Sequence, residues 1–209
     1  VEDANLVTLA PGATSPSQCV CPEEETGLVL VSIAGRRRCV CPAGTEYRAS
    51  TGACTECLPG AYRPFDARAD VSEQCASCSS LGDKGLITEG AGAQSADACV
   101  CPALTYERTY DGRRLCFKCN ETVSCEDPGA TLESLNLLPG YWRASLRTAD
   151  IRLCPLGTAA CVGGSGRGAD GYCAPHHEGA YCSLCAPGFY FVASGECRPC
   201  DAEELRTVA

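Results

Sequence analysis

Cysteine is the residue of this chain with the clearest capacity for chemistry, since 20 of the 209 residues are cysteines. A thiol can bind zinc, exchange a disulfide with another protein, or form a permanent disulfide that cross-links the chain. Most of the cysteines lie in close pairs separated by one or two residues: Cys19/Cys21, Cys39/Cys41, Cys54/Cys57, Cys75/Cys78, Cys99/Cys101, Cys116/Cys119, Cys182/Cys185 and Cys197/Cys200. Cysteine at about one residue in ten indicates a disulfide scaffold. Such a scaffold forms where thiols are oxidised, outside the cytosol.

The other two uses of cysteine are alternatives. The Cys-x2-Cys steps could be zinc knuckles, but a zinc ribbon needs two of them brought together. The Cys-x-Cys-Pro steps and the Pro-Gly turns of this chain favour disulfides, so we expect no metal and no cofactor. Redox activity of the thioredoxin type needs a Cys-x2-Cys between a strand and a helix, and the sequence offers no such setting.

The two histidines of the chain, His176 and His177, precede Glu178. A metal site or a pH switch is one interpretation, and an exposed turn is the one we expect. There is no third histidine, and every cysteine is expected to be bonded. No nucleophile can therefore be assigned a base, and we predict no catalytic residues and no enzymatic activity.

The composition leaves little material for an apolar core, because four Phe, one Trp and no Met accompany 22 Gly and 13 Pro. Disulfides, worth about 2–4 kcal/mol each, must supply the missing constraint.

The net charge of −9 argues against nucleic acid as a partner. The most apolar stretch, Gly27 to Gly35, is too short to span a bilayer. Only Lys84 and Lys118 of the 17 basic residues are lysines, a bias from which we draw nothing.

The chain contains an internal repeat. Residues 6–22 (LVTLAPGATSPSQCVCP) and 86–102 (LITEGAGAQSADACVCP) align without a gap, at an offset of 80 residues (86 minus 6). An arginine-containing turn follows in both copies, at 35–39 and 112–116. Self-similarity of this kind is typical of an array of structural units.

A smaller motif recurs as a Pro-Gly turn followed by an aromatic residue, at 42–47, 59–62, 139–142 and 187–190, with a variant lacking the glycine at 102–106. The turn favours a short strand beginning at the aromatic residue, whose ring can cover a neighbouring disulfide. We expect strands at Leu28–Ile33, Glu46–Arg48, Leu86–Thr88, Thr105–Tyr110, Tyr141–Arg147 and Phe189–Val192. A helical turn is expected within Ala130–Leu138, and Asp201–Val208 could begin a helix. The predicted fold class is small disulfide-rich modules with short β-hairpins and loops, little helix, and an elongated tandem arrangement.

Two parts of the chain resemble known extracellular modules. The run Cys54-x2-Cys57-x-Pro-Gly-x-Tyr, Cys75-x2-Cys78 and Gly92-Ala93-x-Ser95-x3-Cys99-x-Cys101-Pro resembles the ephrin-receptor-like repeat, which is related in style to tumour-necrosis-factor-receptor modules. The run Cys173-x3-His177-x-Gly179-x2-Cys182-x2-Cys185-x2-Gly188-Phe189-Tyr190 is similar to the C-terminal half of an EGF-like module. Runs of both modules, joined by a Pro-Gly-Tyr-Trp-Arg segment like residues 139–143, are similar to very large surface proteins of algae and oomycetes. The acidic cluster of calcium-binding EGF modules is absent, so no bound calcium is expected.

From these features we predict five parts. Residues 1–56 contain the end of one cysteine-rich repeat and a connecting module, and 57–125 form a second ephrin-receptor-like or TNFR-like repeat. Residues 126–153 are a cysteine-free linker with an apolar cluster around Trp142, and 154–200 form an EGF-like module. Residues 201–209 are a tail or the start of a next module.

The repeat favours a sequential disulfide scheme, in which each close pair ends one loop and opens the next. The predicted bonds are Cys21–Cys39, Cys41–Cys54, Cys57–Cys75, Cys78–Cys99, Cys101–Cys116, Cys119–Cys125, Cys154–Cys161, Cys173–Cys182 and Cys185–Cys197. Cys19 and Cys200 remain, and we expect them to bond to other segments of a longer array or to other chains. A crossed scheme that begins with Cys19–Cys39 and Cys21–Cys41 is the alternative, and it would pair all twenty.

Two further surface features suggest partners. Asn120-Glu121-Thr122 is an N-glycosylation sequon, which is consistent with secretion and an exposed loop. Arg36–Arg38 and Arg113/Arg114 could bind an anionic glycan, although solvated hairpin tips are the expected interpretation, as for Glu23–Glu25.

The sequence favours a secreted structural or interaction protein, on the cell surface or the flagellar surface. The leading hypothesis is a segment of a filament-forming assembly, such as a flagellar hair or matrix fibre, with other copies or other extracellular proteins as partners. The alternative is the ectodomain of a receptor or adhesin that binds a protein or glycan. A zinc-binding intracellular protein is a third hypothesis.

Overall fold

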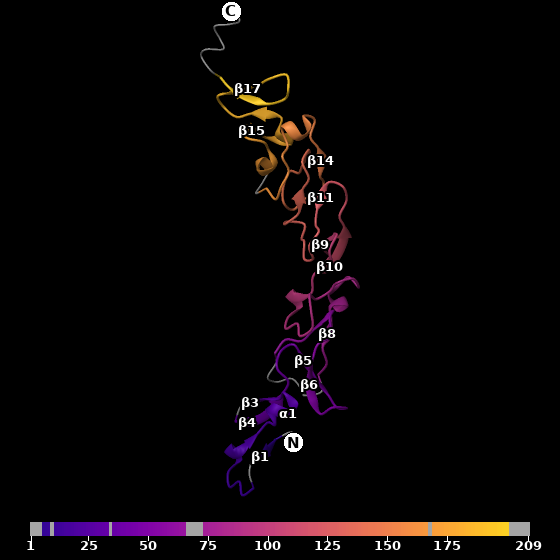
Figure 1. The fold of residues 1–209 in the computed structure, drawn as a ribbon, viewed down its shortest axis with the longest axis vertical. Coiled ribbons are helices and arrows are strands. Elements are labelled where there is room, and N and C mark those ends of the chain that lie inside the picture. Colours follow the sequence, from indigo (N-terminus) through magenta and orange to yellow (C-terminus); the bar gives the residue numbers. More distant parts are fainter. Residues whose placement is uncertain (1–5, 9–10, 34, 66–72, 167–168, 201–209) are drawn as a thin grey trace, which may run out of the picture. The chain divides into compact units, whose positions relative to one another are not determined.

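The structure is a computed structural model that describes residues 6–8, 11–33, 35–65, 73–166 and 169–200. The chain folds as two compact units, whose strands and short helices are traced in Figure 1. Unit 1 comprises Val1–Val100 with Asp111–Arg114, and unit 2 comprises Cys101–Tyr110 with Leu115–Ala209.

Unit 1 consists of short antiparallel hairpins, and its strands pair in chain order. The pairs are β1 (Val7–Thr8) with β2 (Cys19–Val20), β3 (Val29–Ile33) with β4 (Arg36–Val40), β5 (Thr45–Arg48) with β6 (Ala53–Glu56), and β7 (Ala61–Tyr62) with β8 (Ala76–Ser77). Its helices are α1 (Glu23–Thr26) and the 3-10 helices η1 (Pro16–Gln18), η2 (Cys78–Leu81) and η3 (Ala96–Ala98).

Unit 2 has the same construction. Its hairpins pair β9 (Thr105–Tyr110) with β10 (Arg113–Lys118, which begins in unit 1), β11 (Val123–Ser124) with β12 (Asn136–Leu137), β13 (Tyr141–Trp142) with β14 (Arg152–Leu153), β15 (His177–Glu178) with β16 (Leu184–Cys185), and β17 (Phe189–Phe191) with β18 (Cys197–Pro199). Three 3-10 helices complete it: η4 (Gly157–Ala159), η5 (Ala169–Tyr172) and η6 (Ala180–Cys182).

This architecture confirms the predicted class of disulfide-rich hairpins with little helix. Every sheet of the described residues has two strands. Strands β3, β5, β9 and β17 fall at or within one residue of the expected ranges, whereas the strand expected over Tyr141–Arg147 ends at Trp142. The segment Leu86–Thr88 contributes a single bridge, from Ile87 to Val100. The helix start expected over Asp201–Val208 lies outside the described residues.

Two local predictions are wrong. Ala130–Leu138 contains no helix, because the side chains of Thr131 and Ser134 take each other's backbone N–H groups (2.9 and 3.2 Å) and close a tight turn instead. Conversely, the glutamates expected in a solvated loop begin helix α1. Negative side chains favour the first turn of a helix, and Gly27 ends it in the left-handed conformation (φ 67°).

Each unit has a small core that contains buried cysteines, three of the four residues in unit 1 and four of the eleven in unit 2. In unit 1, Leu28 packs with Cys21, Cys39 and Cys41, and the ring of Tyr47 lies against this cluster. In unit 2 the larger cluster is Val123, Cys125, Leu132, Leu135, Leu137, Trp142, Cys154, Ala160, Cys161, Tyr172 and Cys182. The apolar cluster expected around Trp142 is therefore present, and it is continuous with the cysteines that follow residue 153. The division into five parts stays a prediction. The two compact units meet between Val100 and Cys101, which is not one of the predicted boundaries.

Candidate functional site

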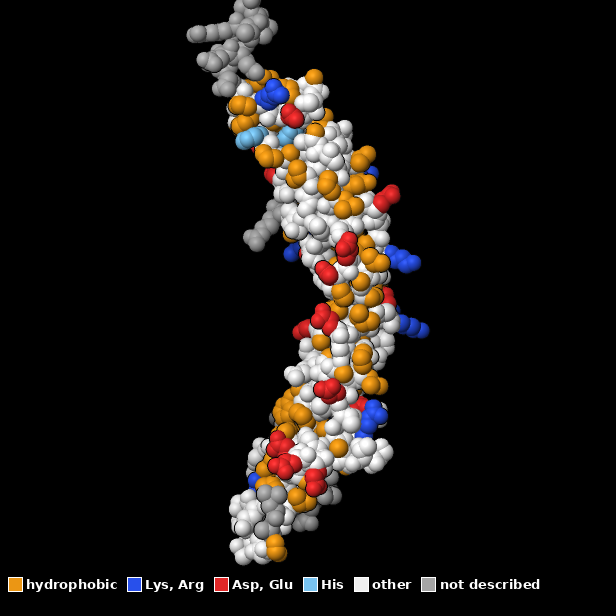
Figure 2. All heavy atoms as spheres, in the orientation of Figure 1, with side chains coloured by type: hydrophobic (Ala, Val, Ile, Leu, Met, Phe, Trp, Pro, Cys, Tyr) orange, Lys and Arg blue, Asp and Glu red, His pale blue; other side chains and the backbone are white. Residues whose placement is uncertain are grey.

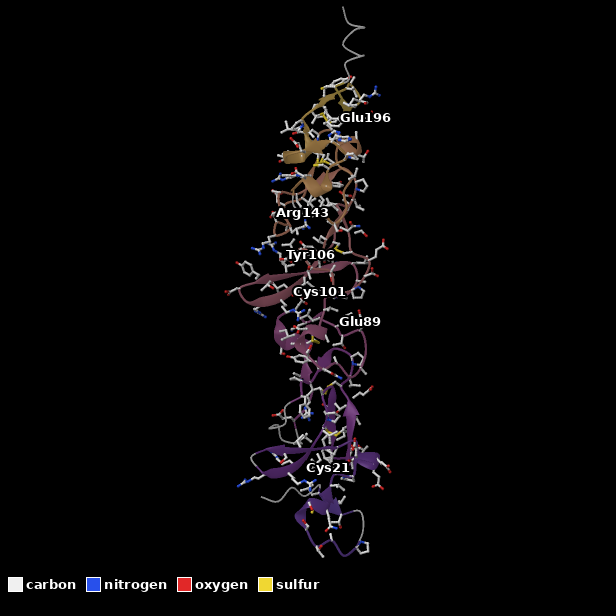
Figure 3. All side chains as sticks on the ribbon, turned by 90° about the vertical axis from the view of Figure 1, so that its left-hand side faces the viewer. Cys21, Glu89, Cys101, Tyr106, Arg143 and Glu196 are labelled. Carbon is white, nitrogen blue, oxygen red and sulfur yellow. A yellow bond between two sulfur atoms is a disulfide. The ribbon has the colours of Figure 1, made fainter. Side chains whose placement is uncertain are left out.

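Nine disulfides cross-link the chain, and their bonds recur along the ribbon of both units (Figure 3). They join Cys21–Cys39, Cys41–Cys54, Cys57–Cys75, Cys78–Cys99, Cys101–Cys116, Cys119–Cys125, Cys154–Cys161, Cys173–Cys182 and Cys185–Cys197. These are the pairs of the sequential scheme, and the crossed pairs do not form. Cys19 in β2 is a half-buried free thiol, and Cys200 after β18 is an exposed one.

Five turns place these cysteines by one shared geometry. Each turn contains a residue with φ between 63° and 91°, and its carbonyl oxygen accepts a hydrogen bond from the N–H of the cysteine that follows the hairpin. The pairs and their N–O distances are Gly44 with Cys57 (2.8 Å), Gly60 with Cys78 (2.9 Å), Leu104 with Cys119 (3.0 Å), Gly140 with Cys154 (2.8 Å) and Gly188 with Cys200 (2.8 Å). The recurrent Pro-Gly motif is thus one structural device, and the glycine-free variant at 102–106 shares it.

The N–H group of the same turn residue makes a second bond, to the next loop. The acceptors are the carbonyl oxygen of Arg63 for Gly44, Oγ1 of Thr88 for Gly60, and the carbonyl oxygens of Cys125 and Cys161 for Leu104 and Gly140, at 2.8–2.9 Å. In all four cases the acceptor belongs to the disulfide loop that the hairpin's cysteine opens. In these four cases the hairpin is therefore joined to the following loop by two contacts: the hydrogen bond from the N–H of the turn residue, and the disulfide that closes the loop. We call these two contacts together the link.

Leu104 departs from the pattern, because it is a leucine in a conformation that favours glycine (φ 63°). A Cβ atom in this region costs about 1–2 kcal/mol. The Leu104 side chain is 65% exposed and buries little in return.

We predict that Leu104→Gly raises the free energy of unfolding by about 0.5–1 kcal/mol, since relief of the Cβ clash exceeds the added entropy of the unfolded chain. The measurement is urea unfolding with the disulfides intact. Leu58→Gly is the matched control: Leu58 is equally exposed but has no positive φ, so this variant should be less stable than the wild type. Equal losses in both variants would contradict the argument.

The repeat of residues 6–22 and 86–102 is also a repeat in three dimensions. The equivalent features are the strand contacts Val7–Val20 and Ile87–Val100, the 3-10 helices η1 and η3, and the left-handed glycines Gly12 (φ 88°) and Gly92 (φ 76°). Identical backbone features at corresponding positions show that the two segments fold as copies of one unit.

In each copy, an arginine of the turn that follows donates hydrogen bonds back to the copy's own backbone. Nη1 of Arg37 donates to the carbonyl oxygen of Ser17 (2.8 Å). The corresponding Arg114 donates from Nη1 to Ala96 (3.0 Å) and from Nη2 to Cys99 (2.5 Å). These two guanidinium groups are structural, so they are neither freely solvated nor available in full to a glycan. On the face drawn in Figure 2, Lys and Arg side chains lie apart from one another and form no continuous patch.

Arg143 organises the long cysteine-free segment, and sequence analysis missed it. Its side chain is fully buried (Figure 3 marks its place). Nε donates to Oη of Tyr172 (2.6 Å), and the two terminal nitrogens donate to carbonyl oxygens of Leu132, Glu133, Leu135 and Leu146 at 2.6–3.4 Å. A buried guanidinium is tolerated when its donors are satisfied. This arginine cross-links the segment where no disulfide does.

We predict that Tyr172→Phe lowers the free energy of unfolding by about 1–3 kcal/mol, because Nε of Arg143 then loses its acceptor inside the core. Unfolding in urea, followed by Trp142 fluorescence, measures the change. Tyr110→Phe removes the same atom from an exposed ring and should change stability by less than about 0.5 kcal/mol. A Tyr172→Phe variant as stable as this control would refute the role of the buried contact.

The two histidines occupy different environments. His176 is exposed, but its ring stacks on Phe189, with centroids 3.8 Å apart. His177 is buried, with Nδ1 3.1 Å from the carbonyl oxygen of Cys182 and its ring against Phe191. The exposed turn expected for both is correct only for His176, because the β15–β16 hairpin turns His177 inward. No group of three or more His, Cys, Asp or Glu side chains within the described ranges could hold a metal ion.

Asn120 lies exposed in the short loop between Cys119 and Cys125. Its Oδ1 accepts hydrogen bonds from the N–H (3.1 Å) and the hydroxyl (2.6 Å) of Thr122. Both contacts use Oδ1 of this exposed residue, and the amide nitrogen that would carry a glycan takes no part in them.

We predict that Asn120 carries a glycan when the chain is secreted from a eukaryotic host. Treatment with a peptide-N-glycosidase should lower the intact mass and convert Asn120 to aspartate. Thr122→Ala should abolish the shift because it removes the sequon hydroxyl, while Asn136→Gln, a change outside any sequon, should leave it unaltered. A secreted wild-type chain of unmodified mass would contradict the prediction.

Comparison with protein families, curated proteins and solved structures gave no match. In the part of the chain that the structure describes, no helix is long and apolar enough to cross a membrane.

Proposed function

We propose that this chain is a non-enzymatic extracellular structural protein, a segment of a rod-like or filament-forming assembly at the cell or flagellar surface. Flagellar hairs (mastigonemes) and matrix fibres are examples of such assemblies. Its modules resemble ephrin-receptor-like, TNFR-like and EGF-like units. The observation that carries the proposal is the link, which recurs four times: each time the N–H of the turn residue donates to the disulfide loop that the hairpin's cysteine opens.

A repeated local link suits a structural role for a physical reason. When each unit is held by its neighbours, stability is a sum of nearest-neighbour contributions, and units can be added without rearranging the others. The disulfides supply rigidity that the small clusters around Leu28 and Trp142 cannot supply alone. Nine disulfides in 209 residues are typical of secreted proteins, since the cytosol keeps thiols reduced. The partners on this proposal are other copies of the chain or other extracellular proteins, with glycans as a further class.

Immunogold electron microscopy of the native organism tests the function. Antibodies to the folded chain should label fibres or hairs at a regular axial spacing, and mild reduction should shorten or dissolve the labelled fibres. Alkylation of the native protein in denaturant without reductant should modify at most two cysteines.

Two other outcomes would overturn the proposal. Diffuse labelling of the plasma membrane, together with capture of a soluble protein or glycan ligand, would identify a receptor or adhesin ectodomain instead. Many alkylated cysteines together with bound zinc would identify an intracellular metal-binding protein.

A further inference from the structure

The last hairpin among the described residues, at 185–200, is a structural copy of an earlier one. Residues 57–62 (CLPGAY) and 185–190 (CAPGFY) align, and both hairpins end in Cys-x2-Cys. Their strand registers are equivalent, Ala61–Ser77 with Tyr62–Ala76 in one, and Phe189–Pro199 with Tyr190–Arg198 in the other. The turn bonds also correspond, Cys78 N–H to Gly60 at 2.9 Å and Cys200 N–H to Gly188 at 2.8 Å. At the turn and the paired strand residues, hairpin 185–200 therefore presents the same backbone groups as residues 57–62 and 76–78 of the earlier hairpin.

The earlier hairpin shows what this backbone binds. Gly60 donates its N–H to Oγ1 of Thr88 (2.9 Å), and Cys78 bonds to Cys99. Two backbone contacts flank them, from Gly92 N–H to the carbonyl oxygen of Cys57 (2.9 Å) and between Tyr62 and Ala93. This interface excludes solvent, since Thr88 is 7% exposed and Cys99 is fully buried. The partner of the hairpin is thus the segment 86–100.

That segment has its own copy, residues 6–20, in which every binding position is preserved. Thr8 corresponds to Thr88, Gly12 to Gly92, Ala13 to Ala93 and Cys19 to Cys99. As shown above, the copies share strand pairing, 3-10 helix and left-handed glycine. Yet Thr8 is exposed and the Cys19 thiol is free.

Hairpin 185–200 and segment 6–20 each contain one side of the link, and the two sides are complementary. Gly188 makes no hydrogen bond from its N–H within the described residues, and the Cys200 thiol is free and exposed. These atoms occupy the positions of Gly60 N–H and Cys78 Sγ, whereas Thr8 and Cys19 occupy those of Thr88 and Cys99. Within the described residues, the donor side of a link (Gly188 and Cys200) and the acceptor side (Thr8 and Cys19) are therefore both present, and neither makes the contacts of a link.

We propose that hairpin 185–200 of one copy binds segment 6–20 of a second copy. Gly188 N–H donates to Oγ1 of Thr8, and a Cys200–Cys19 disulfide closes the interface. This inference rests on the proposed structural function and names the contact by which copies join. A second copy is the occupant because the same chain already contains this interface, formed by residues 57–62 and Cys78 with the segment 86–100. The interface is heterologous, so each copy still offers one free half and addition can continue.

Disulfide formation needs an oxidant, and a small-molecule disulfide in the extracellular space supplies it. The Cys200 thiolate attacks this disulfide, forms a mixed disulfide and releases one small thiol. The Cys19 thiolate then attacks the Cys200 sulfur of the mixed disulfide and releases the second small thiol. Two protein thiols are oxidised to one disulfide, and one small disulfide is reduced to two thiols, which take up the two protons.

Complementary single variants test the pairing. We expect the wild-type chain, incubated in a glutathione redox buffer, to give a ladder of covalent oligomers on a non-reducing gel. Cys19→Ser alone and Cys200→Ser alone should each stay monomeric, because each retains only one half. Their equimolar mixture should give a single dimer and nothing longer, with a Cys19–Cys200 cross-linked peptide in the mass spectrum. Retention of the nine internal disulfides by each variant shows that it has folded.

Thr8→Val tests the non-covalent part. Loss of the acceptor should slow wild-type oligomer formation roughly fivefold, the factor for a hydrogen bond worth about 1 kcal/mol. Thr51→Val, at an exposed threonine in the β5–β6 turn, should leave the rate unchanged.

Homodimers of either single variant, a Cys19–Cys200 bond within one chain, or no cross-link would overturn the inference. So would native material in which Cys19 is bonded to any cysteine other than Cys200. The proposed function and this inference can fail separately. Dimers in the mixture of variants, without labelled fibres on cells, would reject the function but support the contact between copies. Labelled fibres that lack the Cys19–Cys200 peptide would support the function but reject the contact.

Discussion

The structure depends on the peptide group of the left-handed turn residue that precedes five of its hairpins. The carbonyl oxygen of this residue fixes the cysteine that ends the hairpin, and in four of the five its N–H fixes the loop that this cysteine opens. The disulfide then makes the arrangement permanent, at about 2–3 kcal/mol for loops with sequence separations of 6 to 21. A two-stranded hairpin alone is at best marginally stable in water. Hydrogen bond and disulfide together turn such hairpins into units that hold their shape without a large core.

Arginine provides the second type of cross-link. Arg37, Arg63, Arg114 and Arg143 all donate to backbone carbonyl oxygens of other loops. A guanidinium carries five donors in a rigid fork, so one side chain can satisfy several carbonyls at once, which lysine cannot do. This difference gives a physical reason for arginine rather than lysine at these four positions. The clearest case is Arg143, which gathers four carbonyl oxygens where the chain has no cysteine.

A chain stabilised in this way has consequences for what it can do. These contacts are local, and four of the hairpins bind the loop that follows them. The same recognition can act between molecules wherever one half of a link is left open, as at Thr8 and Cys19 or at Gly188 and Cys200. Association then needs no new interface, because the chain reuses the contact that builds it. Reuse of the same contact between copies is what the proposed role in an extracellular assembly requires.

The sequence by itself determined the fold class and the internal repeat, and it favoured the sequential disulfide scheme over the crossed one. Cysteine spacing and Pro-Gly turns act over short distances, so pairs such as Cys57–Cys75 could be predicted from neighbours in the chain. Only the tertiary structure decided the role of Arg143, the burial of His177 and the positive φ of Leu104. Each of these depends on which loop packs against which, and loop packing in a chain with weak hydrophobic periodicity leaves no pattern in the sequence. The complementarity of the two free halves also required the structure, because it depends on backbone hydrogen bonds that residue types do not reveal.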